Sequence, residues 1–179
     1  MPAQARLDTG AQKTPGTRGC TGKLNARNSI RIFATMEQQS IQEIQDEIVD
    51  EFSLFDDWMQ RYEYMIELGK SLPVIEARYK TEENLIKGCQ SKVWVHAELR
   101  DGRLYFTADS EAIITKGIIA ILVRAFSGQK PADIIGAKTD FIDEIGLKEH
   151  LSPTRANGLV SMIKQLKLYA VAYETQMES

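Results

Sequence analysis

The sequence predicts an α+β fold in which helices cover one face of a small antiparallel β-sheet. Residues 92–99 alternate strictly between apolar and polar side chains, as a half-buried strand does. Asp101-Gly102 then fits a two-residue hairpin turn, followed by a return strand over 104–107. Apolar side chains recur at helical spacing on both sides of this hairpin. The helices therefore supply the cover that one face of the sheet needs.

Two helices are predicted before the sheet. The first begins near Ser40, with apolar residues at helical spacing as far as Phe52. The second follows a break near Ser53, and Gly69 and Pro73 stop it. The polar stretch 74–83 predicts a loop, and 85–86 is a candidate for a short extra strand ahead of the hairpin.

Helices also follow the sheet. Asp109 or Ser110 is suited to cap a helix whose apolar stripe runs over 113–125 and which ends at Gly128. Residues 132–146 suggest one or two short helical pieces. Ser152-Pro153 is a start signal for the last helix, since proline is favoured in a first turn. The predicted order is α-α-β-β-β-α-α.

Residues 1–35 differ from the rest of the chain. They hold six basic residues and one acidic residue and show almost no apolar periodicity, which predicts a disordered basic extension. Two explanations stay open: an organellar transit peptide, or a start codon assigned too early, with Met36 as the natural start. We favour the early start. Residues 36–179 are predicted to form one folded domain, since the 179-residue chain is 43% hydrophobic.

Charge and composition exclude several classes of function. Residues 36–179 hold 16 basic and 24 acidic residues, a net charge of −8, which argues against nucleic-acid binding. No apolar run has the roughly 20 residues of a membrane span. The two cysteines, Cys20 and Cys89, are too few for a four-cysteine zinc site. Two lone thiols fit a reducing compartment, so we expect the cytoplasm.

Cys89 is the main candidate for chemistry. It follows Gly88 and lies between two candidate strands, so we expect it at the tip of a loop. Reactive cysteines work as thiolates, and Lys87, Lys92 and the loop's backbone amides are expected to favour that form. The alternative is an inert, buried cysteine, which most free cysteines are. Spacing alone leaves both possibilities open.

Four ordered motifs resemble the SufE family of sulfur-acceptor proteins. Residues 88–94 read GCQSKVW, similar to the family's GCQSxVW signature. Residues 66–73 (IELGKSLP), 108–120 (ADSEAIITKGIIA) and 151–159 (LSPTRANGL) resemble three further family segments. Together the motifs cover roughly residues 41–172, whereas residues 1–35 have no counterpart in the resemblance.

The resemblance implies a SufE/IscU-like fold and a specific role. Cys89 would take persulfide sulfur from a cysteine desulfurase, an enzyme that uses pyridoxal phosphate, and would stimulate that enzyme. It would then pass the sulfur to an iron–sulfur scaffold. The chain would be a carrier and not an enzyme, with no cofactor and no metal of its own. The desulfurase and scaffold that it serves, SufE type or CsdE type, and its oligomeric state stay open.

The resemblance also points to residues around the thiol. Arg155 matches the family's arginine at the start of the last helix, where it would line the pocket or contact the desulfurase; otherwise it is a solvated arginine. Asp109 matches a family acid, although a helix cap would explain it equally well. Gln90 would hydrogen-bond within the loop or to the partner. Nothing in the spacing makes His96 or His150 a base for Cys89.

Three other functions compete with the carrier: a metal scaffold, an independent cysteine hydrolase or transferase, and an adaptor that carries no sulfur. The first lacks soft ligands, and the second lacks a Cys-His pattern. A carrier should shelter its persulfide from solvent thiols, which predicts a buried Cys89 in the free protein.

Overall fold

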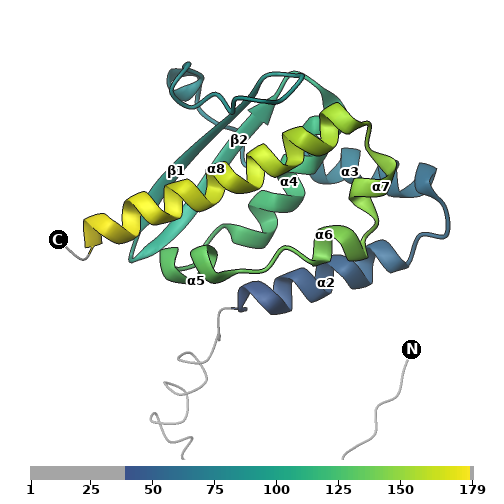
Figure 1. Ribbon diagram of the computed structural model, residues 1–179, viewed down its shortest axis with the longest axis horizontal. Coiled ribbons are helices and arrows are strands. Elements are labelled where there is room, and N and C mark those ends of the chain that lie inside the picture. The colour runs from purple at the N-terminus through teal and green to yellow at the C-terminus, as the bar shows by residue number, and fades with distance from the viewer. Residues whose placement is uncertain (1–38, 178–179) are drawn as a thin grey trace, which may run out of the picture. The chain divides into compact units, whose positions relative to one another are not determined.

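The computed structural model describes residues 39–177, and the predicted extension at 1–35 lies outside them. The elements in chain order are α2 (Ile41–Ser53), α3 (Trp58–Lys70), the 3-10 turn η1 (Ala77–Tyr79), β1 (Val93–Arg100), β2 (Arg103–Ser110), α4 (Ile113–Phe126), α5 (Pro131–Gly136), α6 (Phe141–Glu144), α7 (Leu147–His150) and α8 (Pro153–Met177). Figure 1 shows how they are arranged. The α+β class predicted from the sequence is confirmed.

The sheet of the described residues is one antiparallel hairpin, β1–β2. Its register runs from Val93 opposite Ser110 to Arg100 opposite Arg103. Asp101 and Gly102 form the predicted two-residue turn with φ values of 50° and 73°, the left-handed conformations that match the twist of a hairpin. The return strand is longer than predicted, because the inward alternation continues beyond residue 107 through Ala108 to Ser110.

The predicted third strand at 85–86 is wrong. Leu85 forms only an isolated bridge with Trp94. The amide of Ile86 donates to the carbonyl of Val93 at 2.8 Å, and the amide of Val95 donates to the carbonyl of Asn84 at 2.9 Å. These two bonds attach the segment to the edge of β1 but leave it too short to form a strand. They also close the base of the loop that carries Cys89.

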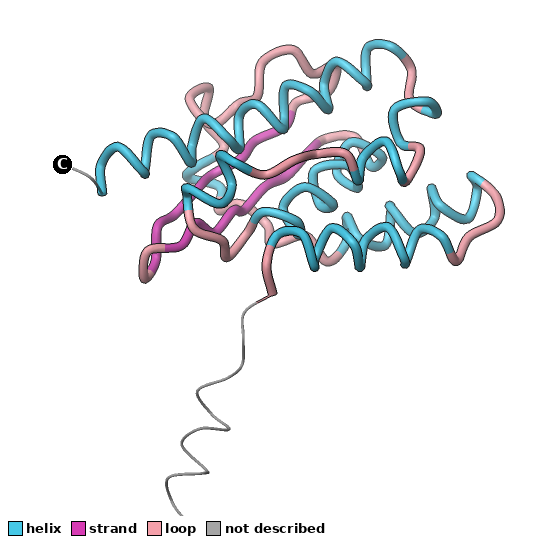
Figure 2. Tube along the Cα trace, turned by 60° about the horizontal axis from the view of Figure 1, so that its bottom comes forward, coloured by secondary structure: helices cyan, strands magenta, loops and turns pink. Residues whose placement is uncertain are grey.

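Helices α4 and α8 pack on one face of the hairpin (Figures 1 and 2). The inward side chains of both strands are buried: Val93, Val95, Ala97, Leu104, Phe106 and Ala108. Two tyrosines of α8 tie this helix to β1, since the hydroxyls of Tyr169 and Tyr173 donate to the carbonyls of Val95 and Ala97 at 2.9 and 3.0 Å. The position of α8 relative to the sheet is therefore set by polar contacts as well as by burial.

Helix α3 approaches α4 closely through glycines. A Cβ atom built on Gly117 would lie 2.5 Å from the carbonyl oxygen of Met65, and one on Gly69 would lie 3.1 Å from the amide nitrogen of Gly117. Gly69 does not stop α3 as predicted, because the helix continues to Lys70. It is a packing position, and no side chain fits between the two backbones.

Helix starts were predicted correctly at two positions and wrongly at one. Ser40 and Glu43 form a capping box at the start of α2, and α8 begins at Pro153. Helix α4 instead begins at Ile113 without a side-chain cap, because Asp109 and Ser110 still belong to β2. The hydroxyl of Ser110 accepts from the amide of Ala112 at 3.3 Å just before the helix. Neither residue is the N-cap.

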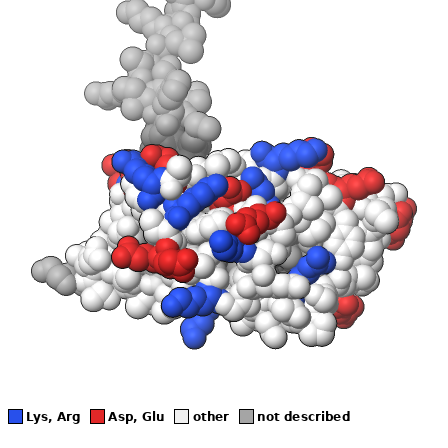
Figure 3. Space-filling model, turned by 90° about the horizontal axis from the view of Figure 1, so that it is seen from above, with Lys and Arg blue, Asp and Glu red and all other residues white. Residues whose placement is uncertain are grey.

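The surface of the described residues carries mixed charge. On the face shown in Figure 3, acidic and basic side chains are interspersed, and no continuous basic stripe crosses it. Within 39–177 no helix is long and apolar enough to cross a bilayer.

Candidate functional site

The cysteine loop, residues 87–92, has a fixed base. The carbonyl of Lys92 accepts from the hydroxyl of Ser110 at 3.0 Å and from the amide of Glu111 at 3.3 Å. Gly88 has a φ of +91°, a conformation that side-chain-bearing residues rarely adopt. The sequence prediction that Cys89 lies on a sharp loop made possible by Gly88 is therefore confirmed.

The tip of the loop rests against the N-terminal part of α8. The thiol of Cys89 donates to the carbonyl of Gly158, with Sγ 3.6 Å from the oxygen. A Cβ atom on Gly158 would lie 3.4 Å from Sγ, and one on Gly88 would lie 2.9 Å from Oγ of Ser161. Gly158 and Ser161 are one helical turn apart, so they present small side chains on one face. The loop can seat there because those side chains are small.

The thiol is half-buried and packs against the main hydrophobic core. The predicted shelter is therefore partial. Burial raises the pKa of the Cys89 thiol above its ordinary value, because a thiolate loses hydration in an apolar environment. The thiol in this conformation is protonated at neutral pH.

The expected support for the thiolate is not found in this conformation. Burial raises the pKa of Cys89, and within residues 39–177 the hydrogen bond of its thiol goes to the carbonyl of Gly158 and not to Lys87 or Lys92. The Nζ atom of Lys92 lies 3.9 Å from a carboxylate oxygen of Glu111. The sulfur meets a carbonyl acceptor and not backbone amides. Activation must therefore come from a change in the loop or from a partner.

Gln90 follows Cys89 directly in the chain, and Arg155 belongs to the helix on which the cysteine loop rests. Both are exposed, and within the described residues neither side chain makes a hydrogen bond. Arg155 lies three residues before Gly158 in the first turn of α8, so its side chain shares the helix face that meets Cys89. Both side chains are free to meet a partner that approaches the sulfur.

Asp109 forms two ion pairs beside the base of the cysteine loop. Its carboxylate oxygens lie 2.6 Å from Nζ of Lys80 and 2.8 Å from Nζ of Lys116. Burial by itself would raise the pKa of Asp109, but hydrogen bonds from Lys116, Lys80 and the backbone of Ser110 outweigh it and lower the pKa to about 2. Asp109 thus joins the loop before β1, the end of β2 and the first turn of α4. It does not contact the thiol.

The histidines have structural partners away from the sulfur. His96 stacks on Tyr79 with ring centroids 3.7 Å apart, and His150 stacks on Trp58 at 3.6 Å. Trp94 is half-buried, with Nζ of Lys80 5.7 Å from its ring centroid. Neither histidine is placed to act as a base for Cys89.

Sequence reasoning missed three residues of this site. Gly158 lies in a motif quoted above, but only the folded chain reveals that its face of α8 meets Cys89. Ser161 belongs to the same face of α8, but it lies outside the quoted motifs, so no sequence pattern pointed to it. Lys80 lies in a polar loop of no recognisable pattern, and its pairing with Asp109 joins residues 29 positions apart.

Cys89 has few potential metal-ligating side chains around it. Among residues 39–177, no three His, Cys, Asp or Glu side chains are grouped so that they could hold a metal ion. Cys89 is the free cysteine of the described residues. The arrangement offers one thiol on a loop that could present it to another protein.

Comparison with known proteins identifies the family. The model of the SufE family, described as an Fe-S metabolism associated domain, matches residues 46–170. The chain belongs to the SufE family. A SufE-like protein of Rhizobium meliloti is 44% identical over 127 residues, covering 68% of this chain and 91% of the relative. A SufE-like protein of Synechocystis is 35% identical over 127 residues, covering 71% of this chain and 80% of the relative. Membership places the chain in iron–sulfur metabolism.

Two further similarities extend this result. SufE-like protein 1 of Arabidopsis thaliana, named as chloroplastic/mitochondrial, is 37% identical over 133 residues, which are 74% of this chain and 36% of that protein. The solution structure of a hypothetical protein from Thermus thermophilus matches with a TM-score of 0.63 at 19% identity, covering 74% of this chain and 96% of that one. The latter match supports the fold alone.

Proposed function

We propose that this SufE-family protein is a sulfur carrier for iron–sulfur cluster assembly. Cys89 accepts sulfur from the persulfide of a pyridoxal-phosphate-dependent cysteine desulfurase and delivers it to a cluster scaffold. The chain is not an enzyme by itself, but it stimulates the desulfurase by clearing the persulfide. The carrier domain is 36–179, and a reducing compartment such as the cytoplasm suits its free thiol.

One observation carries the proposal: the half-buried thiol of Cys89 sits at the tip of a loop that is fixed at its base, and it donates a hydrogen bond to the carbonyl of Gly158. A carrier needs a thiol that can reach a partner's active site and return to shelter. The neighbouring Gln90 and Arg155 are exposed, so they are available to contact the desulfurase. Membership of a family in iron–sulfur metabolism supports this use of the thiol.

The transfer is a thiol–persulfide exchange. The Cys89 thiolate attacks the outer sulfur of the desulfurase persulfide, and a new S–S bond forms at Sγ. The S–S bond of the donor breaks, and its electron pair leaves on the donor cysteine as a thiolate. The proton of the Cys89 thiol ends on the donor cysteine or on solvent. The step involves no net oxidation.

The raised pKa of Cys89 gives the carrier a resting state. A protonated, half-buried thiol is a poor nucleophile toward solvent oxidants and small thiols. When a partner draws the loop off α8, hydration returns to the sulfur and the thiolate becomes accessible. The same seat would shield a persulfide after transfer.

Intact-mass spectrometry tests the proposal. The full chain is incubated with a cysteine desulfurase and cysteine, and we expect a gain of about 32 Da, one sulfur atom, on Cys89. Cys20→Ser is the matched control and should still gain sulfur, whereas Cys89→Ser should not. Equal gains in both variants, or no gain in the wild type, would contradict the proposal. Desulfurase stimulation without any gain would favour the adaptor.

A further inference from the structure

The outer face of the hairpin, opposite α4 and α8, is crossed by an arch of chain, residues 73–86. At one end of the arch, the amide of Ala108 in β2 donates to the carbonyl of Pro73 at 3.0 Å. At the other end, the amide of Val95 in β1 donates to the carbonyl of Asn84 at 2.9 Å. The arch therefore runs from the edge of β2 to the edge of β1, with the outward side chains of the sheet beneath it.

The space between the arch and the sheet is the arch cavity, about 430 Å³ in volume. Its lining includes two arginines, two glutamates and two tyrosines: Glu76, Arg78, Tyr79, Glu98, Arg100 and Tyr105. Small-molecule sites measure roughly 300–1,000 Å³ and combine ring faces with a few placed polar groups. The arch cavity therefore has the size and the chemistry to bind a small charged molecule.

The arch wall of the cavity holds a pre-organised charge pair. Nε of Arg78 lies 2.9 Å from a carboxylate oxygen of Glu76, and the guanidinium carbon lies 4.7 Å from the centre of the Tyr79 ring. Tyr79 in turn stacks on His96 of β1, with ring centroids 3.7 Å apart. An arginine held by a carboxylate and a ring has lost rotamer freedom already, so a ligand that binds it has less ordering to do.

The sheet wall of the cavity repeats this arrangement. Arg100 pairs with Glu98 of the same strand, and its guanidinium carbon lies 5.6 Å from the centre of the Tyr105 ring. A hydrogen bond from Arg100 lowers the pKa of Glu98, and the charges of His96 and Arg78 act in the same direction. Because Arg78 belongs to the arch, its effect on Glu98 indicates that the two walls face each other across the cavity.

The charges of the lining match a zwitterion. The two arginines and the two glutamates cancel in charge, which suits neither a pure anion nor a pure cation. An α-amino acid carries a carboxylate and an ammonium one carbon apart, and each wall offers a guanidinium donor beside a carboxylate acceptor. The side chains of both ion pairs are more than half exposed. Pairs so exposed contribute little to stability, so a ligand can separate them at low cost.

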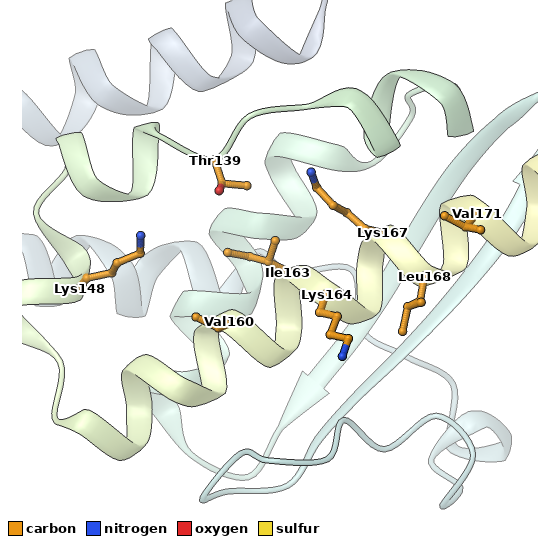
Figure 4. A pocket seen from close by; sticks show the side chains of 8 residues that line it. All are labelled: Thr139, Lys148, Val160, Ile163, Lys164, Lys167, Leu168 and Val171. Atoms are coloured by element: carbon orange, nitrogen blue, oxygen red, sulfur yellow. The ribbon is translucent and has the colours of Figure 1, made fainter.

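The groove along α8, shown in Figure 4, lacks this combination. It has a volume of about 380 Å³, and its lining includes Lys148, Lys164 and Lys167 but no carboxylate. The ammonium group of an amino acid therefore has no charged acceptor there. The α8 groove serves as an internal reference for binding at the arch cavity.

We propose that the arch cavity binds a free α-amino acid in its zwitterionic form. The ligand carboxylate lies between Arg78 and Arg100, and the ligand ammonium donates to Glu98. Val74 and Thr107, which also line the cavity, contact the side chain of the ligand. The site is independent of the proposed sulfur transfer, because no residue of the cysteine loop lines the arch cavity.

An NMR titration of the isotope-labelled full chain tests this proposal. Each proteinogenic L-amino acid is added singly, up to about 10 mM, a concentration at which even weak ligands bind. We expect one or more of them to shift the amide resonances of the arch, β1 and β2, and to leave those of the α8 groove unchanged. The N-acetyl derivative and the amide of the tightest ligand should each bind about tenfold or more weakly, because each lacks one of the two charges.

Variants locate the two charges of the ligand. Arg100→Gln and Glu98→Gln should each weaken binding by about tenfold or more. In Glu98→Gln the N-acetyl derivative should bind as tightly as the parent amino acid, because the acceptor for the ammonium is gone. Glu67→Gln is the matched control, since it breaks an exposed ion pair with Lys70 outside the cavity. It should bind like the wild type. Circular dichroism establishes that each variant is folded.

Several results would overturn the proposal. One is a wild-type spectrum that no amino acid changes, and another is a set of shifts confined to the α8 groove. Derivatives that bind as tightly as the parent to the wild type would mean that the cavity does not recognise both charges. Binding that is unaltered in Arg100→Gln and Glu98→Gln would place the site elsewhere. Sulfur acceptance by Cys89 should be the same in both variants, which separates this proposal from the carrier function.

Discussion

Asp109→Asn should destabilise the protein in a pH-dependent way. The substitution keeps the shape of the side chain but removes the charge that pairs with Lys80 and Lys116. The pKa of Asp109 falls from 3.8 to about 2 on folding, which corresponds to about 2 kcal/mol at about 1.4 kcal/mol per pKa unit. The Asp109 side chain is 16% exposed and that of Lys80 is 34% exposed. Solvent screening therefore reduces the expected loss to about 1 kcal/mol.

The pH dependence follows from the direction of the shift. Because the folded-state pKa of Asp109 is depressed, its contribution to stability is complete above pH 3.8 and disappears as the pH falls through about 2. Urea unfolding of the wild type and of Asp109→Asn, measured from neutral pH downward, should show the two free energies of unfolding converging in that window.

The matched control is Asp143→Asn. Asp143 pairs with Lys148 on the surface, with side-chain exposures of 58% and 42%, so its loss should cost little. If Asp109→Asn is as stable as the wild type at neutral pH, or if its deficit is the same at every pH, the ion-pair reasoning is refuted. If Asp143→Asn loses as much free energy of unfolding as Asp109→Asn, the burial of Asp109 does not strengthen its ion pairs.

Two further predictions concern glycines. Gly117→Ala should lower the free energy of unfolding by about 2 kcal/mol or more, because its Cβ would lie 2.5 Å from the Met65 carbonyl oxygen. Thermal or urea unfolding measures this loss. The control is Gly136→Ala, whose Cβ meets nothing within 4 Å and which should keep the stability of the wild type. Gly158→Val should push the tip of the cysteine loop off α8 and return the pKa of Cys89 toward its ordinary value, so alkylation of Cys89 should be faster at neutral pH and its pH profile should shift downward. Gly158→Ala should change the profile less, because its Cβ makes only ordinary contact, 3.4 Å from Sγ. Profiles that coincide for the valine variant and the wild type would mean that Gly158 does not set the state of the thiol.

Local patterns in the sequence were sufficient for most of the fold. The alternation before Asp101-Gly102 identified the hairpin, and Ser40 and Ser152-Pro153 marked helix starts. These signals are local, because strand faces, hairpin turns and helix caps depend on residues a few positions apart. The same rules failed at 85–86 and at Asp109. Short apolar runs and possible caps are compatible with more than one structure until a neighbouring element selects one.

The candidate site likewise has features that local sequence patterns predict and features that depend on tertiary packing. The sequence by itself determined that Cys89 follows a glycine on a loop that leads into β1, and its motifs matched a family. Only the tertiary structure decided that this loop rests on Gly158 and Ser161, that burial raises the pKa of the thiol, and that Asp109 joins two lysines beside the loop's base. Those features join residues tens of positions apart. Their distances and solvation depend on how α8 and α4 pack on the hairpin, which no local pattern encodes.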